Sequence, residues 1–147
     1  MSFWRCHYHL IWTTRQRLPV IDTSREVLIA KCIVSIADEQ HVEVHAIGIV
    51  EDHVHVAVSI PPRLGVASVV QQFKGSSSNK LRKAQGSRTE AWPGWQAEYG
   101  VLTFGDGSFE RIASYVANQK EHHRNATLWA PLEQIRADMP ITTNVSP

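Results

Sequence analysis

Two apolar runs separated by only two residues constrain the fold of this 147-residue chain more than any other feature. VEVHAIGIV (42–50) and HVHVAVSI (53–60) both alternate toward β-branched residues, as strands do. The two residues between them leave room only for a tight turn, so the pair predicts an antiparallel β-hairpin. Within the second run, His53 and His55 are two positions apart and therefore project from the same face of the strand.

The remaining pattern completes a small α+β fold. Further strands are expected at 6–14 and 96–104, and helices at 23–40, 65–85 and 109–124. The order βαββαβ followed by a helix is typical of a ferredoxin-like split-βαβ sandwich, an antiparallel sheet with helices on one face, here with a C-terminal helix added. The length suits one domain, residues 1–147, of which the tail 125–147 contains three prolines and little periodicity.

Local signals predict details of the helices. In the first helix, Thr23 or Ser24 is the candidate N-cap, and apolar residues recur at helical spacing at Val27, Ala30, Ile33 or Val34, and Ala37. A Gly-Ser run at 75–78 weakly interrupts the second helix. Ser108 is the expected N-cap of the third helix, with Glu110 in its first turn.

Composition argues against a membrane or secreted protein. No apolar run approaches the roughly 20 residues of a membrane span, and the N-terminus has polar and basic residues where a signal peptide needs an unbroken apolar stretch. Cys6 and Cys32 have no metal-ligand spacing and are a poor disulfide framework, so buried free thiols are expected. The sequence therefore predicts a cytoplasmic protein with no membrane partner.

The net charge is only +1, but the basic residues are segregated. Residues 1–21 and 53–89 contain nine of the 15 Lys and Arg residues and no Asp or Glu. Such segregation predicts either a basic face that binds phosphate backbones or ordinary solvated side chains that scatter over the surface. The candidate DNA-binding residues are Arg15, Arg17, Lys74, Lys80, Arg82 and Lys83.

The pair His53 and His55 is by itself a weak signal for a metal, because HYH at 7–9 has the same form. A partner on the last predicted helix strengthens it: Tyr115 and Gln119 are four residues apart and share one helix face. Two imidazoles and a carboxamide oxygen then form a candidate ligand set for a divalent cation, with a phenol one helical turn away.

Such a set suggests phosphoryl chemistry. Neutral ligands leave most of the cation's charge available to polarise a phosphodiester. Tyr115, with an unperturbed pKa of about 10, would be a covalent nucleophile at phosphorus. Geometry and the cation would have to activate it, because the sequence shows no dedicated base.

These motifs resemble a known family. DHVHV followed by SYVANQKEHHR is similar to the single-tyrosine HUH transposases of the insertion-sequence 200/605 type and their REP-associated relatives. YHLIWTTRQRLPVI (8–21) resembles the family's first strand and arginine-bearing loop, and FKGSSSNKLRK (73–83) its second helix. WQAEYGVLTFG (95–105) resembles the strand before the tyrosine helix, so the resemblance spans nearly the whole chain.

The resemblance implies a role for each matched residue. His53 and His55 match the HUH histidines, Tyr115 the nucleophile and Gln119 the third metal ligand. It also implies Mg²⁺ or Mn²⁺, single-stranded DNA with hairpins, and a 5′-phosphotyrosine intermediate with a free 3′-hydroxyl. A homodimer that shares its active sites is expected on the same basis. His122 is a fallback ligand or proton donor, and the resemblance assigns no role to His123.

Other functions remain open. One is a domesticated relative that binds hairpins without moving DNA; a relaxase or replication initiator is disfavoured by the short chain. A non-catalytic nucleic-acid-binding module on a ferredoxin-like sheet would display aromatic residues on its central strands, which the two hairpin strands lack. A metal-dependent hydrolase would use water as nucleophile. Trp92 and Trp95 are the candidates for a base-stacking platform.

Overall fold

The computed structural model describes residues 2–137, and within them one four-stranded sheet organises the chain. The strand order is β2-β3-β1-β4, and every neighbouring pair is antiparallel. This is the order of a split-βαβ fold, so the predicted ferredoxin-like architecture is confirmed. The strands are β1 (His7–Thr13), β2 (Glu43–Val50), β3 (His53–Ser59) and β4 (Gly100–Phe104).

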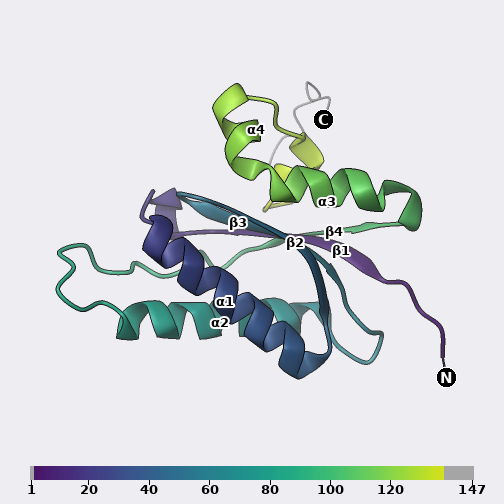
Figure 1. Cartoon of the computed structure of the whole chain (residues 1–147), viewed down its shortest axis with the longest axis horizontal. Helices are drawn as coiled ribbons and strands as arrows, with labels where there is room; N and C mark the ends of the chain where they lie inside the picture. The colour runs from purple at the N-terminus through teal and green to yellow at the C-terminus, as the bar shows by residue number, and fades with distance from the viewer. Residues whose placement is uncertain (1, 138–147) are drawn as a thin grey trace.

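Helices cover both faces of the sheet (Figure 1). α1 (Thr23–Gln40) and α2 (Val66–Lys83) pack on the face that carries Leu10, Trp12 and the alternating valines of β3. α3 (Phe109–Ala117) and α4 (Gln119–Asn125) cover the other face. Among the described residues no helix is long and apolar enough to cross a bilayer. Three short 3-10 helices complete the fold: η1 (Arg15–Arg17), η2 (Asp106–Ser108) and η3 (Ala130–Glu133).

The predicted hairpin is confirmed, with β2 and β3 joined by a two-residue turn. The predicted strand at 96–104 is too long, because β4 begins only at Gly100. Lys74 explains the difference: its ammonium donates to the carbonyls of Gln96 and Ala97, at 2.6 and 3.1 Å, and ties this stretch to α2. Lys74 therefore has a structural contact in place of the free cation that the sequence suggested.

Helix α1 has the predicted bounds but a different cap, and its buried face was predicted only in part, because Ile33 and Ala37 are buried as expected. Asp22, not Thr23 or Ser24, is the N-cap, and its carboxylate accepts a hydrogen bond from the Arg25 amide. Val27 and Val34, expected on the core face, are both 48% exposed. The buried positions are Arg25, Ile29, Cys32, Ile33 and Ala37. Both cysteines are free, and only Cys32 is fully buried.

Helix α2 runs without the interruption expected at 75–78. Two serines of this stretch, Ser77 and Ser78, are buried because they are partners for indoles. Trp95 donates to Ser77 Oγ and Trp92 to Ser78 Oγ, both at 3.0 Å. The two tryptophans are therefore core residues, and the suggested base-stacking platform is wrong.

The third predicted helix is divided in two at Asn118. This residue has φ −105° and ψ 29°, and its side-chain amide donates to the Ser114 carbonyl at 2.9 Å. A side chain that binds a carbonyl of the preceding turn competes with regular helix and is typical of a helix end. Ser108 does occupy the N-cap position of α3, although its side chain makes no capping hydrogen bond.

Two glycines let the second layer approach the sheet closely. A Cβ at Gly48 on β2 would lie well inside contact distance of the Val116 carbonyl and 2.5 Å from Gln119 Cγ. A Cβ at Gly100 on β4 would likewise overlap the Gln134 carbonyl. The α3–α4 junction and the segment that contains η3 therefore rest directly on strand backbone.

Gly48→Ala should lower the free energy of unfolding by about 1–3 kcal/mol, because the added methyl group overpacks the α3–α4 junction. Gly75→Ala is the matched control, since nothing lies within 4 Å of a Cβ at that helical position. The control should gain up to about 1 kcal/mol from helix propensity. Urea denaturation of both variants measures the difference, and equal stability of Gly48→Ala and wild type would contradict the close approach.

Candidate active site

The two histidines of β3 lie between the sheet and the second helical layer. β3 begins at His53 directly after the turn, and His55 pairs with Ile11 on one side and Gly48 on the other. Their side chains are 1% and 0% exposed. The same-face orientation expected from their spacing is confirmed, because the valines that alternate with them lie in the opposite core.

Each ring is held by its Nδ1 atom. His53 Nδ1 is 2.6 Å from the Asp52 carboxylate, and His55 Nδ1 is 2.7 Å from Nε2 of His9 on β1. Arg17 in turn contacts the second oxygen of Asp52 at 3.4 Å. These contacts suit the tautomers in which Nδ1–H donates and Nε2 keeps a free lone pair, which is the usual arrangement behind a metal-binding imidazole.

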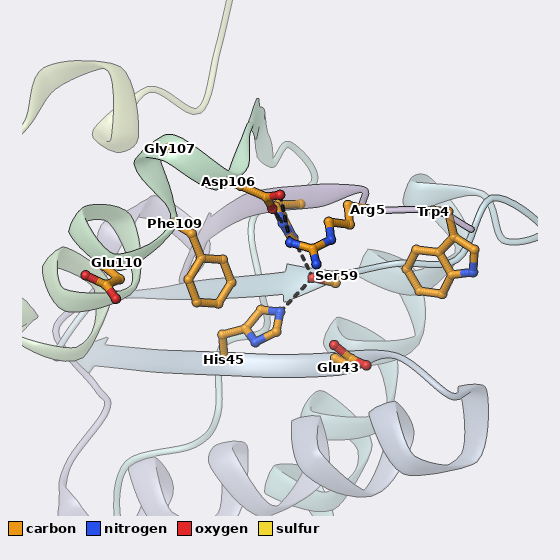
Figure 2. A pocket seen from close by; sticks show the side chains of 10 residues that line it. Trp4, Arg5, Glu43, His45, Ser59, Asp106, Gly107, Phe109 and Glu110 are labelled. Carbon is orange, nitrogen blue, oxygen red and sulfur yellow. Dashed lines mark hydrogen bonds and ion pairs between the residues drawn. The ribbon is translucent and has the colours of Figure 1, made fainter.

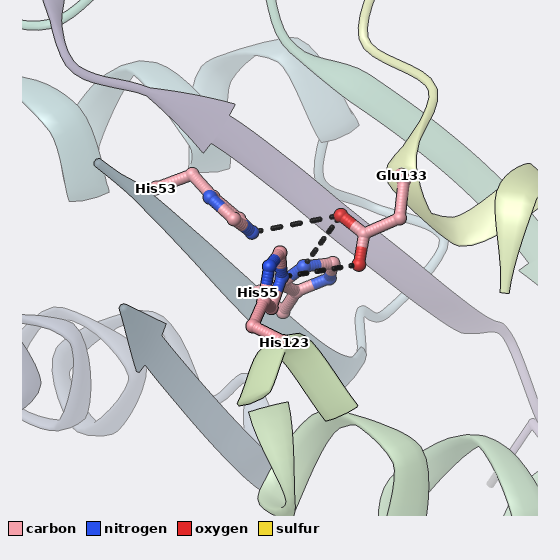
Figure 3. A group of neighbouring side chains, drawn as sticks. All are labelled: His53, His55, His123 and Glu133. Carbon is pink, nitrogen blue, oxygen red and sulfur yellow. Dashed lines mark ion pairs between the residues drawn. The ribbon is translucent and has the colours of Figure 1, made fainter. Parts of the chain in front are cut away.

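The Nε2 atoms face a carboxylate from a distant part of the chain (Figure 3). Glu133 Oε2 lies 3.5 Å from Nε2 of His53 and 3.2 Å from Nε2 of His55. His123 of α4 approaches the other oxygen, with Nε2 3.5 Å from Oε1. One donor atom from each of the four residues falls within 4.8 Å of all the others, so they form a group that can hold a metal ion.

Tyr115 lies against this group. Its ring centroid is 6.1 Å from that of His55 and 4.6 Å from that of His122, on which it stacks. The hydroxyl donates to Glu133 Oε1 at 2.7 Å and accepts from the Trp129 amide at 2.9 Å. Only 2% of the tyrosine is exposed, so a phosphate reaches the hydroxyl only after this cover moves.

Gln119, the predicted third ligand, is also buried beside Tyr115. Its side-chain nitrogen donates to the Tyr115 carbonyl at 2.9 Å, which leaves Oε1 buried with no hydrogen-bond partner. Nε2 of His53, His55 and His123 share this property. Buried polar atoms nearly always have hydrogen-bond partners. The three imidazole nitrogens lie within 4.8 Å of one another and have none, which fits a bound divalent cation.

Two of the buried rings are held in the neutral form by their surroundings. Burial lowers the pKa of His55 to about 4, and burial with the neighbouring His55 holds the pKa of His9 well below its usual value. Both rings are therefore neutral at pH 7. Burial opposes a charge on His53 too, but its contacts with Asp52 and Glu133 outweigh burial and raise its pKa. Burial and the Glu133 charge raise the pKa of Tyr115 well above its usual value, so its phenol is protonated.

The two acid-free segments meet near this site. Arg15 and Arg82 place guanidinium nitrogens 3.7 and 3.6 Å from the position that a Cβ of Gly94 would take. Lys80 and Lys83 are exposed on the last turn of α2. Apart from Lys74, the candidate DNA-binding residues thus remain at the surface.

Sequence reasoning missed His9, Asp52, His123 and Glu133. HYH at 7–9 gave no sign that His9 would contact His55. His122 was the expected fallback ligand because it shares the Tyr115 helix face, but the structure places His123 in the cluster and stacks His122 on Tyr115. Glu133 lies in a segment without periodicity, so only the fold brings it to the histidines. The polar face is also covered by α3, which does not match the open, aromatic sheet of an RNA-binding module.

A second polar cluster lies at the other end of the same sheet face, beside a cavity of about 580 Å³ (Figure 2). Ser59 Oγ is 2.7 Å from His7 Nδ1 and 2.6 Å from His45 Nε2, and His7 Nε2 contacts Asp106 at 2.7 Å. The order carboxylate, imidazole, hydroxyl resembles a hydrolase triad. The Ser59 hydroxyl is 3% exposed and held by an imidazole on each side, so it is not free to attack a substrate.

Comparisons with known proteins agree with this architecture. The family model described as "Transposase IS200 like" matches residues 2–119. The chain is 26% identical over 121 residues to the ISDra2 transposase TnpA of Deinococcus radiodurans, which covers 80% of this chain and 86% of that protein. It is 23% identical over 124 residues to the transposase for insertion sequence element IS200 of Salmonella typhimurium, covering 82% of this chain and 81% of that protein.

Solved structures show the same fold. A REP-associated tyrosine transposase bound to a REP hairpin superposes with a TM-score of 0.61 at 14% identity, over 84% of this chain and 74% of that chain. The named members of the matching family are transposases, a class of enzymes that cleave DNA and transfer its strands. The chain belongs to the IS200-like transposase family.

Asp52→Ala should weaken Mn²⁺ binding by about 10–100-fold, because His53 loses the acceptor that fixes its ring. Isothermal titration with Mn²⁺ measures the loss. Asp38→Ala, which removes an exposed carboxylate from α1, is the control and should bind Mn²⁺ as wild type does. Unchanged affinity of the Asp52 variant would mean that this carboxylate does not orient the ring.

Proposed function

We propose that this chain is a metal-dependent transposase that nicks and rejoins single-stranded DNA through a phosphotyrosine intermediate on Tyr115. The observation that carries the proposal is the set of unpaired buried donor atoms beside that tyrosine. Three imidazole nitrogens that lack hydrogen-bond partners and face one carboxylate are the ligand types that a cation site uses.

His53, His55 and Gln119 are the proposed ligands of Mg²⁺ or Mn²⁺. When bound, the cation supplies Lewis-acid polarisation of the scissile phosphate and offsets the charge that develops on it. Asp52 and His9 keep the two rings oriented, so that both Nε2 lone pairs converge without reorganisation.

Tyr115 is the proposed nucleophile. Its hydroxyl oxygen forms a bond to phosphorus and the phenol proton is lost, while the bond from phosphorus to the 3′ oxygen breaks and that oxygen leaves as a hydroxyl. The DNA 5′-phosphate is then joined to Tyr115, and attack by a 3′-hydroxyl reverses the step and rejoins a strand. This chemistry conserves the energy of the phosphodiester and needs no ATP.

The proposed substrate is single-stranded DNA with hairpins at the ends of the element. Support comes from the relative whose structure holds a REP hairpin and from the basic residues Arg15, Arg17 and Arg82 at the surface. A homodimer is proposed from the family resemblance, and sedimentation velocity at micromolar concentration is its test. The packing of Tyr115 against His55 within one chain favours a self-contained site over the shared one expected from the resemblance.

Tyr115→Phe should abolish strand cleavage and leave hairpin binding intact, because it removes only the attacking oxygen. Wild type incubated with Mn²⁺ and a hairpin-flanked single strand should give a protein–DNA adduct that survives a denaturing gel. The control is Tyr99→Phe, which changes a tyrosine on the other side of the sheet and should retain the adduct. An adduct with the Tyr115 variant would move the nucleophile elsewhere, and cleavage without any adduct would indicate a hydrolase.

Replacing Lys80, Arg82 and Lys83 together with Ala should reduce the salt dependence of single-strand binding. Each lost phosphate contact lowers the slope of log affinity against log salt by about 0.7, so the slope should flatten by about 1–2. Fluorescence anisotropy at several salt concentrations measures the slope. An unchanged slope would place this end of α2 away from the DNA.

A further inference from the structure

We propose that His123 and Glu133 complete the cation site, so that both join His53, His55 and Gln119 as ligands of the ion. This inference rests on the proposed metal-dependent function but adds two ligands that the resemblance does not imply. It also makes the segment after α4 part of the site, because Glu133 is the last residue of η3.

The separations between the donor atoms carry the inference. Ligand atoms bonded to one ion at about 2.0–2.2 Å lie about 3.0–3.5 Å from one another in octahedral or tetrahedral geometry. Glu133 oxygens lie 3.2, 3.5 and 3.5 Å from the three Nε2 atoms. None of these Nε2 atoms has a hydrogen-bond partner, so the contacts have the spacing of shared coordination and lack the geometry of hydrogen bonds (Figure 3).

The fold delivers Glu133 to this position by several contacts that do not involve the histidines. Leu132, the preceding residue, is fully buried against Ala57, Ile112 and Val116. Gln134, the residue after Glu133, places its backbone carbonyl against β4 at Gly100, where there is no side chain. The start of the segment that contains η3 is fixed by Trp129, whose backbone amide donates a hydrogen bond to the Tyr115 hydroxyl. A carboxylate anchored on both sides is a preorganised ligand rather than a surface residue that has folded inward.

The added imidazole and carboxylate also change which metal ion the site prefers. Three imidazoles and one carboxylate favour transition-metal ions such as Mn²⁺ over Mg²⁺, which prefers oxygen ligands and retains water. The carboxylate offsets part of the ion's charge, and the ion offsets the cost of burying the carboxylate. Glu133 Oε1 also accepts a hydrogen bond from the Tyr115 hydroxyl. The Glu133 side chain would therefore contact both the ion and the proposed nucleophile.

The first test measures Mn²⁺ affinity by isothermal titration in the absence of DNA. Glu133→Gln keeps the size of the side chain and should weaken binding by about 10-fold or more, and His123→Asn should do the same. The exposed Glu39→Gln is the control and should bind as wild type does. Wild type should also bind Mn²⁺ more tightly than Mg²⁺.

Tighter Mn²⁺ binding by Glu133→Gln would show that Glu133 is not a ligand. If Glu133 only occupies the place of the ion, Glu133→Gln removes a competitor and Mn²⁺ binds more tightly. Tighter or unchanged binding therefore overturns the inference while leaving the proposed function intact. A wild-type protein that binds no divalent ion at all would instead contradict the proposed function.

A second test needs no variant. Amide hydrogen exchange of residues 127–134 is followed in wild type with and without Mn²⁺. A ligand role predicts slower exchange in this segment when Mn²⁺ is added, because the ion fastens Glu133 to the histidines. Faster exchange would show that the ion expels Glu133 and would overturn the inference even if the variants failed to fold.

Discussion

Imidazoles buried between a sheet and a helical layer must find partners for all their nitrogens, and this requirement organises the rest of the structure. An unpaired polar group in a dry interior costs about 1–3 kcal/mol. Each ring of the pair on β3 satisfies one nitrogen locally, through Asp52 or His9. The second nitrogen of each ring is directed to the same place, where His123 and Glu133 also converge. A divalent cation satisfies all of them together.

One face of the sheet carries most of the hydrophobic core, and the other carries the polar cluster. The face under α1 and α2 is aliphatic and aromatic, and it carries most of the apolar burial that stabilises the chain. The face under α3 can therefore tolerate a polar stripe. Two glycines allow the polar face to be covered closely. Gly48 lets the α3–α4 junction rest on strand backbone, and Gly100 does the same for the η3 segment. The same close approach buries Tyr115, whose hydroxyl is held by Glu133 and by the Trp129 amide.

The sequence predicted the features that depend on local spacing. A two-residue gap is enough to predict the β2–β3 hairpin, and strand alternation is enough to place His53 beside His55. Helix length was also predicted well for α1, and so was the burial of Ile33 and Ala37. Val27 was wrongly placed on the buried face, because Ile29 competes with it at similar hydrophobicity and only packing decides between them. The buried serines of α2 looked like a weak point for a similar reason: their indole partners, Trp92 and Trp95, lie beyond a loop. Glu133 lay beyond prediction, since neither periodicity nor a motif marks it and it meets the histidines only through tertiary structure.

The central claim is that this buried cluster is the cation site of the proposed DNA-nicking reaction. Anomalous diffraction at the manganese edge from crystals soaked in Mn²⁺ tests it most directly. The account predicts one strong peak within about 2.0–2.3 Å of Nε2 of both His53 and His55. No peak between these two rings at saturating Mn²⁺, or a single peak at the Asp106 and Glu110 carboxylates of the other cavity, would contradict it.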